Sequence, residues 1–203
     1  MSINLIYKYF PNLDVESNKK IKKLYLLYKN YNNKINLISR KDFHLFYERH
    51  VLHSLSISKF VQFKKSHDVM DLGTGGGFPG LPLAILFPNT NFYLVDSIKK
   101  KTECISKILT DLDIKNVEVI NSRSENLNKK FDYIITRAVA PLSKLDFLTK
   151  GQFKNSNIGS LICLKGGDLS DELKGFENRI QLVEISSYFE EDFFKTKKIV
   201  FLK

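Results

Sequence analysis

The spacing of apolar residues divides the chain into two parts. In roughly the first 65 residues, apolar side chains recur at the three- and four-residue intervals of a helix, most clearly over residues 21–31. A second helix, with residues 43–61 as its body, is predicted to follow a polar break at which Ser39 or Asp42 is the cap. We therefore expect a helical N-terminal extension over residues 1–66.

From residue 67 onward, short apolar runs alternate with segments of about one helix length. A first strand over residues 67–73 is followed by four runs typical of strands buried on both faces: 91–96, 116–120, 131–137 and 158–166. The helices predicted between them are residues 80–87, 100–112 and 141–151. Two last strand-like runs, separated by a short charged stretch, predict an antiparallel finish at residues 180–189 and 197–203.

Strands and helices in this order are typical of a mostly parallel sheet with helices on both faces. The sequence thus predicts an α/β protein with a Rossmann-like, mixed seven-stranded sheet. We expect residues 67–203 to form one compact domain, because no Pro-rich linker, low-complexity segment or internal repeat interrupts them.

Residues 69–83 read VMDLGTGGGFPGLPL and contain five glycines within eight positions, directly after a predicted strand. Gly73, Gly75 and Gly77 would let the backbone turn tightly and approach a ligand, because they lack a Cβ. Ligands of doubly wound sheets bind beyond the carboxyl ends of the strands. Asp96 ends the next strand, where a carboxylate would bind two ribose hydroxyls. This pattern predicts a nucleotide-like cofactor.

Two cofactor chemistries share this layout. A dinucleotide dehydrogenase would present G-x-G-x-x-G, and Gly75, Gly77 and Gly80 formally match that motif. Asp71 argues against it, because an acid at the strand end is unfavourable beside a pyrophosphate, and Pro79 would occupy the turn whose amides should face phosphate. S-adenosylmethionine carries a sulfonium and an ammonium group instead, so we favour that cofactor.

The net charge of the chain indicates the class of its binding partner. The chain has 203 residues, a net charge of +10 and a pI near 9.4, which favours a polyanion such as nucleic acid. Only five of its 32 basic residues are arginine, so an AT-rich genome is an alternative source of the lysines. No secretory signal or membrane-length apolar run is recognisable. Cys104 and Cys163 lack metal-ligand spacing, and we expect two buried thiols, no metal site and a cytoplasmic protein.

The chain also resembles a known family along nearly its whole length: the small-subunit ribosomal RNA methyltransferase G family (glucose-inhibited division protein B). The most specific match is the FPGLPL continuation of the glycine loop, and ITRAVAPLSKL at residues 135–145 supports it independently. The remaining matches are YNNKINLIS at 31–39, ERHVLHSL at 48–55, FYLVDSIKKK at 92–101, NSRSENL at 121–127 and LICLKG at 161–166.

The resemblance implies a class I methyltransferase fold that uses S-adenosylmethionine to methylate guanine N7 in 16S rRNA, either as naked RNA or in the assembling small subunit. Arg137 matches the family's arginine beside the methyl-transfer centre and is the predicted catalytic residue. The predicted cofactor contacts, from the loop and from the resemblance, are Asp71, Gly73, Thr74, Gly75, Phe78, Asp96, Ser97, Ser124, Glu125 and Arg137.

The sequence departs from the family at two positions. His53 stands where an aspartate is usual, which argues against a charge-dependent role for its helix, and Gly76 stands where proline is frequent. Position 124 varies within the family, so a backbone contact is expected there. The four histidines lie outside the predicted sheet, and we interpret them as surface or helix-packing residues: His44, His50, His53 and His67.

Guanine N7 carries a lone pair and no proton, so the predicted transfer requires alignment rather than a general base. Arg137 would bind a substrate phosphate, the guanine O6 edge or the cofactor carboxylate; Arg123 and Lys165 are further candidates for phosphate contacts. The chain lacks the Asp/Asn-Pro-Pro-aromatic stretch of adenine-N6 enzymes. Two other functions stay open: a dinucleotide-dependent oxidoreductase, and an RNA-binding module with a vestigial pocket. We expect a monomer.

Overall fold

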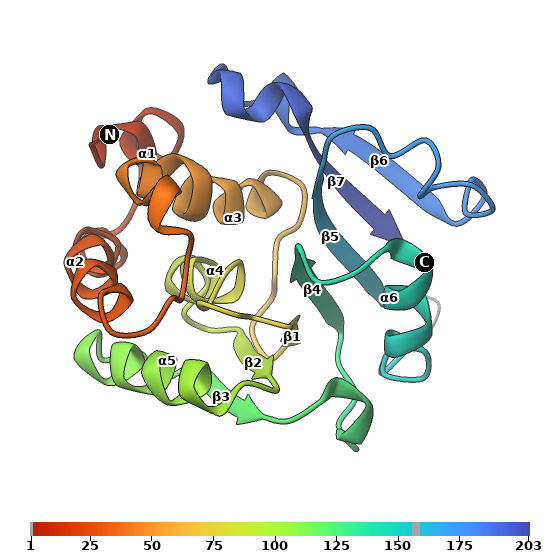
Figure 1. The fold of residues 1–203 in the computed structure, drawn as a ribbon, viewed down its shortest axis with the longest axis horizontal. Coiled ribbons are helices and arrows are strands. Elements are labelled where there is room, and N and C mark those ends of the chain that lie inside the picture. The colour runs from red at the N-terminus through yellow and green to blue at the C-terminus, as the bar shows by residue number, and fades with distance from the viewer. Residues whose placement is uncertain (1, 156–158) are drawn as a thin grey trace.

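The computed structural model describes residues 2–155 and 159–203, in which seven strands form one sheet in the order β3-β2-β1-β4-β5-β7-β6 (Figure 1). The first five strands along the chain are parallel, and β7 runs antiparallel to both β5 and β6. This arrangement confirms the predicted mixed sheet with an antiparallel finish. The strands are β1 Asp68–Leu72, β2 Asn91–Asp96, β3 Val117–Asn121, β4 Tyr133–Arg137, β5 Ser160–Gly166, β6 Ile180–Glu184 and β7 Lys197–Leu202.

Helices precede and connect these strands close to the predicted positions. The α-helices are α1 Asn4–Tyr9, α2 Val15–Asn32, α3 His53–Leu55, α4 Gly80–Leu86, α5 Lys99–Asp111 and α6 Leu142–Thr149. The second predicted N-terminal helix is divided into short 3₁₀, π and α turns over Arg40–Leu45, Tyr47–Leu52, His53–Leu55 and Ser56–Lys59. Ser39 precedes the first of these turns, but its side chain makes no capping hydrogen bond.

Side chains alternate between the two faces of the sheet, and each face has its own core. Val69 of β1 and Ile135 of β4 belong to the core beneath α2, α4 and α5. Met70, which follows Val69, and Ile134, which precedes Ile135, belong to the core covered by α6. Asp71 and Arg137 therefore lie on the α4 side of the sheet, because they are two residues beyond Val69 and Ile135.

One prediction for the sheet is wrong. Residues 116–120 read as a strand buried on both faces, whereas β3 lies at the edge of the sheet and none of its residues is buried. Its apolar side chains Val117, Val119 and Ile120 are half-buried because a neighbouring strand is present on one side only. The prediction that β5 begins at residue 158 falls outside the described residues.

The N-terminal helices share the core of the α4 side. Ile21, Leu24 and Tyr28 of α2 are fully buried in the same apolar cluster as Leu81 of α4. The first helices lie beside α4 and α3 in Figure 1. The boundary between residues 66 and 67 stays a prediction. Among the described residues, no helix is both long and apolar enough to cross a membrane.

Candidate functional site

The buried carboxylate of Asp71 stabilises the glycine loop through two hydrogen bonds. Its Oδ2 accepts a hydrogen bond from the Thr74 hydroxyl at 2.6 Å and another from the backbone N–H of Gly80 at 2.8 Å. The second bond caps the N-terminus of α4, where Pro79 offers no side-chain acceptor. Burial raises the pKa of Asp71 to about 6, although both hydrogen bonds lower it in part. The carboxylate therefore carries its charge at neutral pH and stabilises the turn into the helix.

Three glycines of the loop are required by the backbone conformation. Gly73, Gly75 and Gly77 have φ values of +65°, +58° and +87°, a left-handed conformation that side chains with a Cβ rarely adopt. At Gly80 the reason is space, because an added Cβ would lie 2.7 Å from the capping Oδ2 of Asp71. The conformation of the loop therefore depends on glycines, which lack a Cβ, and on the buried carboxylate of Asp71.

A cavity of about 190 Å³ opens at the carboxyl ends of the parallel strands, directly above this loop. It brings together five of the predicted cofactor residues: Gly73, Asp96, Ser97, Ser124 and Glu125. Its other walls come from residues that the sequence did not single out as cofactor contacts, among them Val95, Val139, Lys144 and Leu148. A cavity in this position agrees with the site expected of a doubly wound sheet.

Asp96 connects the cavity to the loop. Its Oδ2 accepts from the backbone N–H of Gly75 at 2.8 Å, and its Oδ1 accepts from the N–H of Ile98 at 2.8 Å. Each oxygen retains a free lone pair, and the side chain lines the cavity. Asp96 is thus fixed in place by backbone donors while it can still accept hydrogen bonds from ligand hydroxyls.

Arg137 lies on the other side of the strand ends, toward the N-terminal segment. Its Nη1 donates to the carbonyl oxygen of Arg49 at 3.2 Å, and its Nη2 lies 3.2 Å from Nδ1 of His50. The guanidinium also packs over the ring of Phe78, with its carbon 5.1 Å from the ring centre. Burial lowers the pKa of Arg137 to about 10, and Asp71 opposes this shift, so the arginine stays charged at neutral pH.

The predicted site residues therefore fall into two groups. Asp71, Thr74 and Phe78 are buried and do not line the cavity, and Arg137 lines a separate cleft. Gly75 joins the groups through its N–H bond to Asp96. Direct cofactor contacts by the first group stay predictions; the observed contacts of these residues support the loop and the N-terminal segment.

Two residues of the site were missed as contacts by sequence reasoning. His50 was interpreted as a surface or helix-packing residue; it is 8% exposed and packs as such, but it also contacts Arg137. Tyr28 is fully buried, and its hydroxyl donates to the carbonyl oxygen of Gly76 in the loop. Neither contact has a local sequence signal, because the partners are 87 and 48 residues apart.

The loop amides distinguish the two cofactor chemistries. A pyrophosphate would need free N–H groups at the start of α4. The N–H of Gly80 instead donates to Asp71, and the N–H groups of Gly77 and Phe78 donate to the carbonyl oxygen of Thr74. The cavity offers the carboxylates of Asp96 and Glu125, serine hydroxyls and apolar walls, and the cations Arg123 and Lys144 also line it. This lining fits a nucleoside with a small charged tail. The residues present therefore fit S-adenosylmethionine better than a dinucleotide.

Solved structures share this architecture. A putative rRNA methylase from Clostridium thermocellum has a TM-score of 0.54 at 18% identity, over 76% of this chain and 96% of that one. A SAM-dependent methyltransferase from Aquifex aeolicus has a TM-score of 0.54 at 17% identity, over 81% and 98%. At these identities the likeness concerns the fold alone. The fold and the site together define a class I methyltransferase, the class that uses S-adenosylmethionine.

The chain belongs to the rRNA small subunit methyltransferase G family, whose model matches residues 17–200. A ribosomal RNA small subunit methyltransferase G of Bacteroides thetaiotaomicron is 47% identical over 203 residues, covering 98% of both chains. The protein of the same name in Christiangramia forsetii is 46% identical and covers 100% of this chain and 97% of its own. These matches confirm the resemblance that the loop and the ITRAVAPL segment indicated.

Proposed function

We propose that this chain transfers the methyl group of S-adenosylmethionine to N7 of a guanine in 16S rRNA. The observation that carries the proposal is the family match over residues 17–200, together with relatives that are 46–47% identical over nearly the full length of both chains. The positive net charge of +10 agrees with a polyanionic substrate.

The site supplies what this reaction needs. The cofactor would provide an activated methyl group on a positively charged sulfur. Asp96 would accept hydrogen bonds from its ribose hydroxyls, while Gly73 and the backbone near Ser124 and Glu125 would approach its other parts, since all four line the cavity. The Gly75 N–H fixes the Asp96 carboxylate, so this contact is positioned before the cofactor arrives.

The electrostatics of the site are consistent with an N7 acceptor, which loses no proton. Burial lowers the pKa of His50 to about 3 and that of His53 well below its ordinary value, so both imidazoles are neutral. His50 is also engaged by Arg137. We assign Arg137 the role of orienting the guanine nucleotide, because it combines a permanent charge with a position at the end of β4.

Mass spectrometry of rRNA from cells with and without this gene tests the proposal. One 7-methylguanosine should be absent from the 16S rRNA of the deletion strain and should return when purified protein and S-adenosylmethionine are added. Naked 16S rRNA and small subunits from that strain should be compared as substrates. An unchanged modification pattern, with RNA bound but never methylated, would support a binding module instead. Uptake of NADH in place of S-adenosylhomocysteine would support an oxidoreductase.

We further propose a cytoplasmic monomer. The proposed substrate places the protein where ribosomal subunits assemble. Light scattering on the purified protein should give a mass near 23.5 kDa; twice that mass at micromolar concentration would contradict the monomer.

A further inference from the structure

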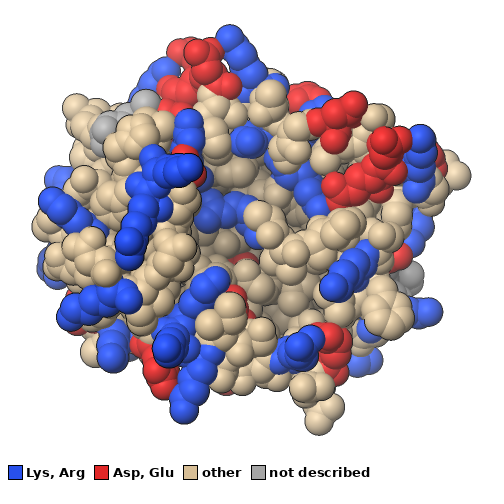
Figure 2. Space-filling view, in the orientation of Figure 1, with Lys and Arg blue, Asp and Glu red and all other residues tan. Residues whose placement is uncertain are grey.

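A second cleft of about 310 Å³ lies next to the cofactor cavity. The loop after β4 separates the two: Ala138 lines the cleft, whereas Val139 and Ala140 line the cavity. Arg137 and His50 are part of the cleft wall. A ligand in the cleft would therefore be one short loop away from the cofactor. Figure 2 shows a hollow near the middle of this face, with Lys and Arg side chains inside and around it.

Four cations line the cleft, and two of them have no acidic partner within ion-pair distance, although the charge of Asp71 acts on Arg137 through space. Arg49 pairs with Asp42, and Lys165 pairs with Glu172. Arg137 and Lys197 make no ion pair with any residue that the structure describes. Unpaired cations in a partly desolvated cleft are costly unless an anion compensates them. The cleft is thus built to receive negative charge.

Lys197 has a defined place in the cleft. It is the first residue of β7 and pairs in register with Gly166, the last residue of β5. A Cβ at Gly166 would lie 2.8 Å from the Lys197 Nζ, so the ammonium occupies space that only a glycine leaves free. The ammonium also lies 4.7 Å from the ring centre of Phe193, which keeps it at the cleft wall.

Two neutral imidazoles complete the wall. His50 and His53 are 8% and 6% exposed, and Nε2 of each has no hydrogen-bond partner in the described protein. The contact from Arg137 occupies Nδ1 of His50, which leaves its Nε2 as the free polar atom. Burial lowers the pKa of both rings, and nearby Arg137 and Lys197 contribute to this for His53. The cleft therefore offers cations and unused polar atoms and places no carboxylate on its wall.

We propose that this cleft binds a backbone phosphate of the rRNA strand that carries the target guanine, with Lys197 and Arg137 as its ligands. The inference rests on the proposed function and adds a subsite to it. Phosphate contacts position a nucleic acid without reading its sequence, so the cleft would fix the strand while the guanine reaches toward the cofactor cavity. Phe193, flanked by Arg49 and Lys197, provides an aromatic face beside this phosphate.

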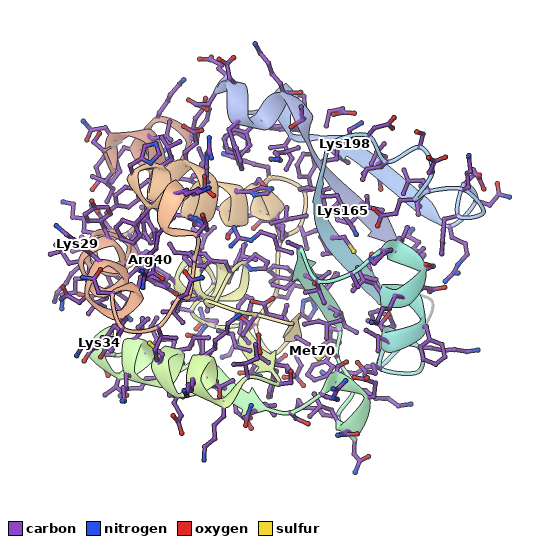
Figure 3. The ribbon with its side chains drawn as sticks, in the orientation of Figure 1. Lys29, Lys34, Arg40, Met70, Lys165 and Lys198 are labelled. Atoms are coloured by element: carbon purple, nitrogen blue, oxygen red, sulfur yellow. The ribbon has the colours of Figure 1, made fainter. Side chains whose placement is uncertain are left out.

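Adjacent lysines of β7 give a matched test. Lys198, the next residue of β7, points to the opposite face of the strand, pairs with Glu184 at 3.0 Å and does not line the cleft. Figure 3 shows Lys165 and Lys198 on their neighbouring strands, with Arg40 across from them on the N-terminal segment. Lys197→Gln and Lys198→Gln therefore make the same charge change on different surfaces. Gly166→Ala is a second variant, which displaces the Lys197 ammonium without changing any charge.

The assay measures KM for 16S rRNA or small subunits, kcat, and RNA affinity as a function of salt. Lys197→Gln should raise KM and the RNA Kd about tenfold. It should also reduce the slope of log K against log salt by the amount that corresponds to about one lost phosphate contact. Gly166→Ala should act in the same direction, and Lys197→Arg should restore wild-type values. The Kd for S-adenosylhomocysteine should stay unchanged in all of them.

Four outcomes are decisive. An effect of Lys197→Gln that Lys198→Gln does not share supports the phosphate subsite. Equal effects of the two variants would mean that Lys197 contributes only to the general surface charge, and would overturn the proposal. An unchanged RNA Kd in Lys197→Gln would also overturn it. A wild-type protein that binds S-adenosylhomocysteine but methylates no rRNA would contradict the proposed function, and the RNA affinities of the variants would still decide on the cleft.

Discussion

Nη2 of Arg137 lies 3.2 Å from Nδ1 of His50, so the guanidinium at the end of strand β4 contacts the N-terminal segment. The neighbouring Nη1 donates to the carbonyl oxygen of Arg49, one residue before His50. These two bonds fix the planar guanidinium in one orientation, with Phe78 beneath it. The N-terminal segment thus sets the orientation of the arginine that we propose binds the target nucleotide.

His50→Ala should reduce methyl transfer while sparing the cofactor. Without the ring, Arg137 loses one of its two fixed contacts, and we expect kcat to fall about 10- to 100-fold, equivalent to roughly 1.4–2.8 kcal/mol in the barrier. The Kd for S-adenosylhomocysteine should change less than threefold, because His50 does not line the cavity. His44→Ala, at an exposed position of the same segment, is the control. Full activity in His50→Ala would remove the contact from the mechanism.

The buried histidines predict a pH dependence of stability. Burial lowers the folded pKa of His50 to about 3, whereas an unfolded histidine titrates near 6.5. The unfolded state therefore takes up a proton first as pH falls, so the contribution of His50 is fully present above pH 6.5 and is lost toward pH 3. By pH 5 the loss should reach about 2 kcal/mol.

Urea denaturation between pH 7.5 and pH 5 measures this effect. The difference between wild type and His50→Asn is the relevant quantity, because Asp71 acts in the opposite direction. Its pKa is raised to about 6, so its contribution is present at low pH and is lost as pH rises through 6. Parallel stability curves for wild type and His50→Asn would contradict the neutral buried ring.

Asp71→Asn should loosen the glycine loop. The amide keeps an acceptor but loses the charge that strengthens the bonds from Thr74 and Gly80, each of which is worth about 1.5–3 kcal/mol with a charged partner. We expect cofactor affinity to fall at least tenfold at pH 7.5, measured by titration calorimetry with S-adenosylhomocysteine. Thr74→Val, which removes one donor only, should show a smaller loss.

The effect of Asp71→Asn should also depend on pH. Near pH 5 the wild-type carboxyl is itself largely protonated, because its pKa is raised to about 6. The difference in affinity between wild type and variant should therefore shrink as pH falls from 7.5 to 5. A constant difference over this range would mean that the charge of Asp71 is unimportant for the loop.

Asp96→Asn should weaken cofactor binding directly, by an amount larger than any accompanying loss of folding stability would produce. Replacing one carboxylate oxygen by an amide removes an acceptor from Gly75 or Ile98 and from the proposed ribose hydroxyls. A loss of about 2 kcal/mol, or roughly 30-fold in the Kd for S-adenosylhomocysteine, is expected. Binding of the variant equal to that of wild type would place the ribose elsewhere.

The position of Asp96 could be predicted from the sequence because two regular signals coincide. The apolar run of residues 91–96 fixes the end of a strand, and parallel strands place their carboxyl ends at one edge of a sheet. Gly73 is predictable on similar grounds, since it directly follows β1. Both residues line the cavity, as expected. Sites at strand ends can therefore be located from pattern alone.

Contacts between distant parts of the chain could not be predicted in this way. The sequence places Asp71 at a strand end, but its partner Gly80 returns to it only because the loop folds back nine residues later. His50 and Arg137 meet across 87 residues. The edge position of β3 depends on strand order, which no local run of residues encodes. Pairing across the sheet, rather than local preference, determines these features.

Tyr28 extends from α2 to the carbonyl oxygen of Gly76, inside the loop that turns beside the cofactor cavity. Nearby, the Leu37 carbonyl oxygen lies so close to Gly76 that a Cβ there would be 2.6 Å from it. The first helices thus support the loop beside the cavity that we assign to the methyl donor. A truncation or gene fusion that dislodged α2 would therefore remove support from this loop, so the sheet alone is not a sufficient catalytic unit.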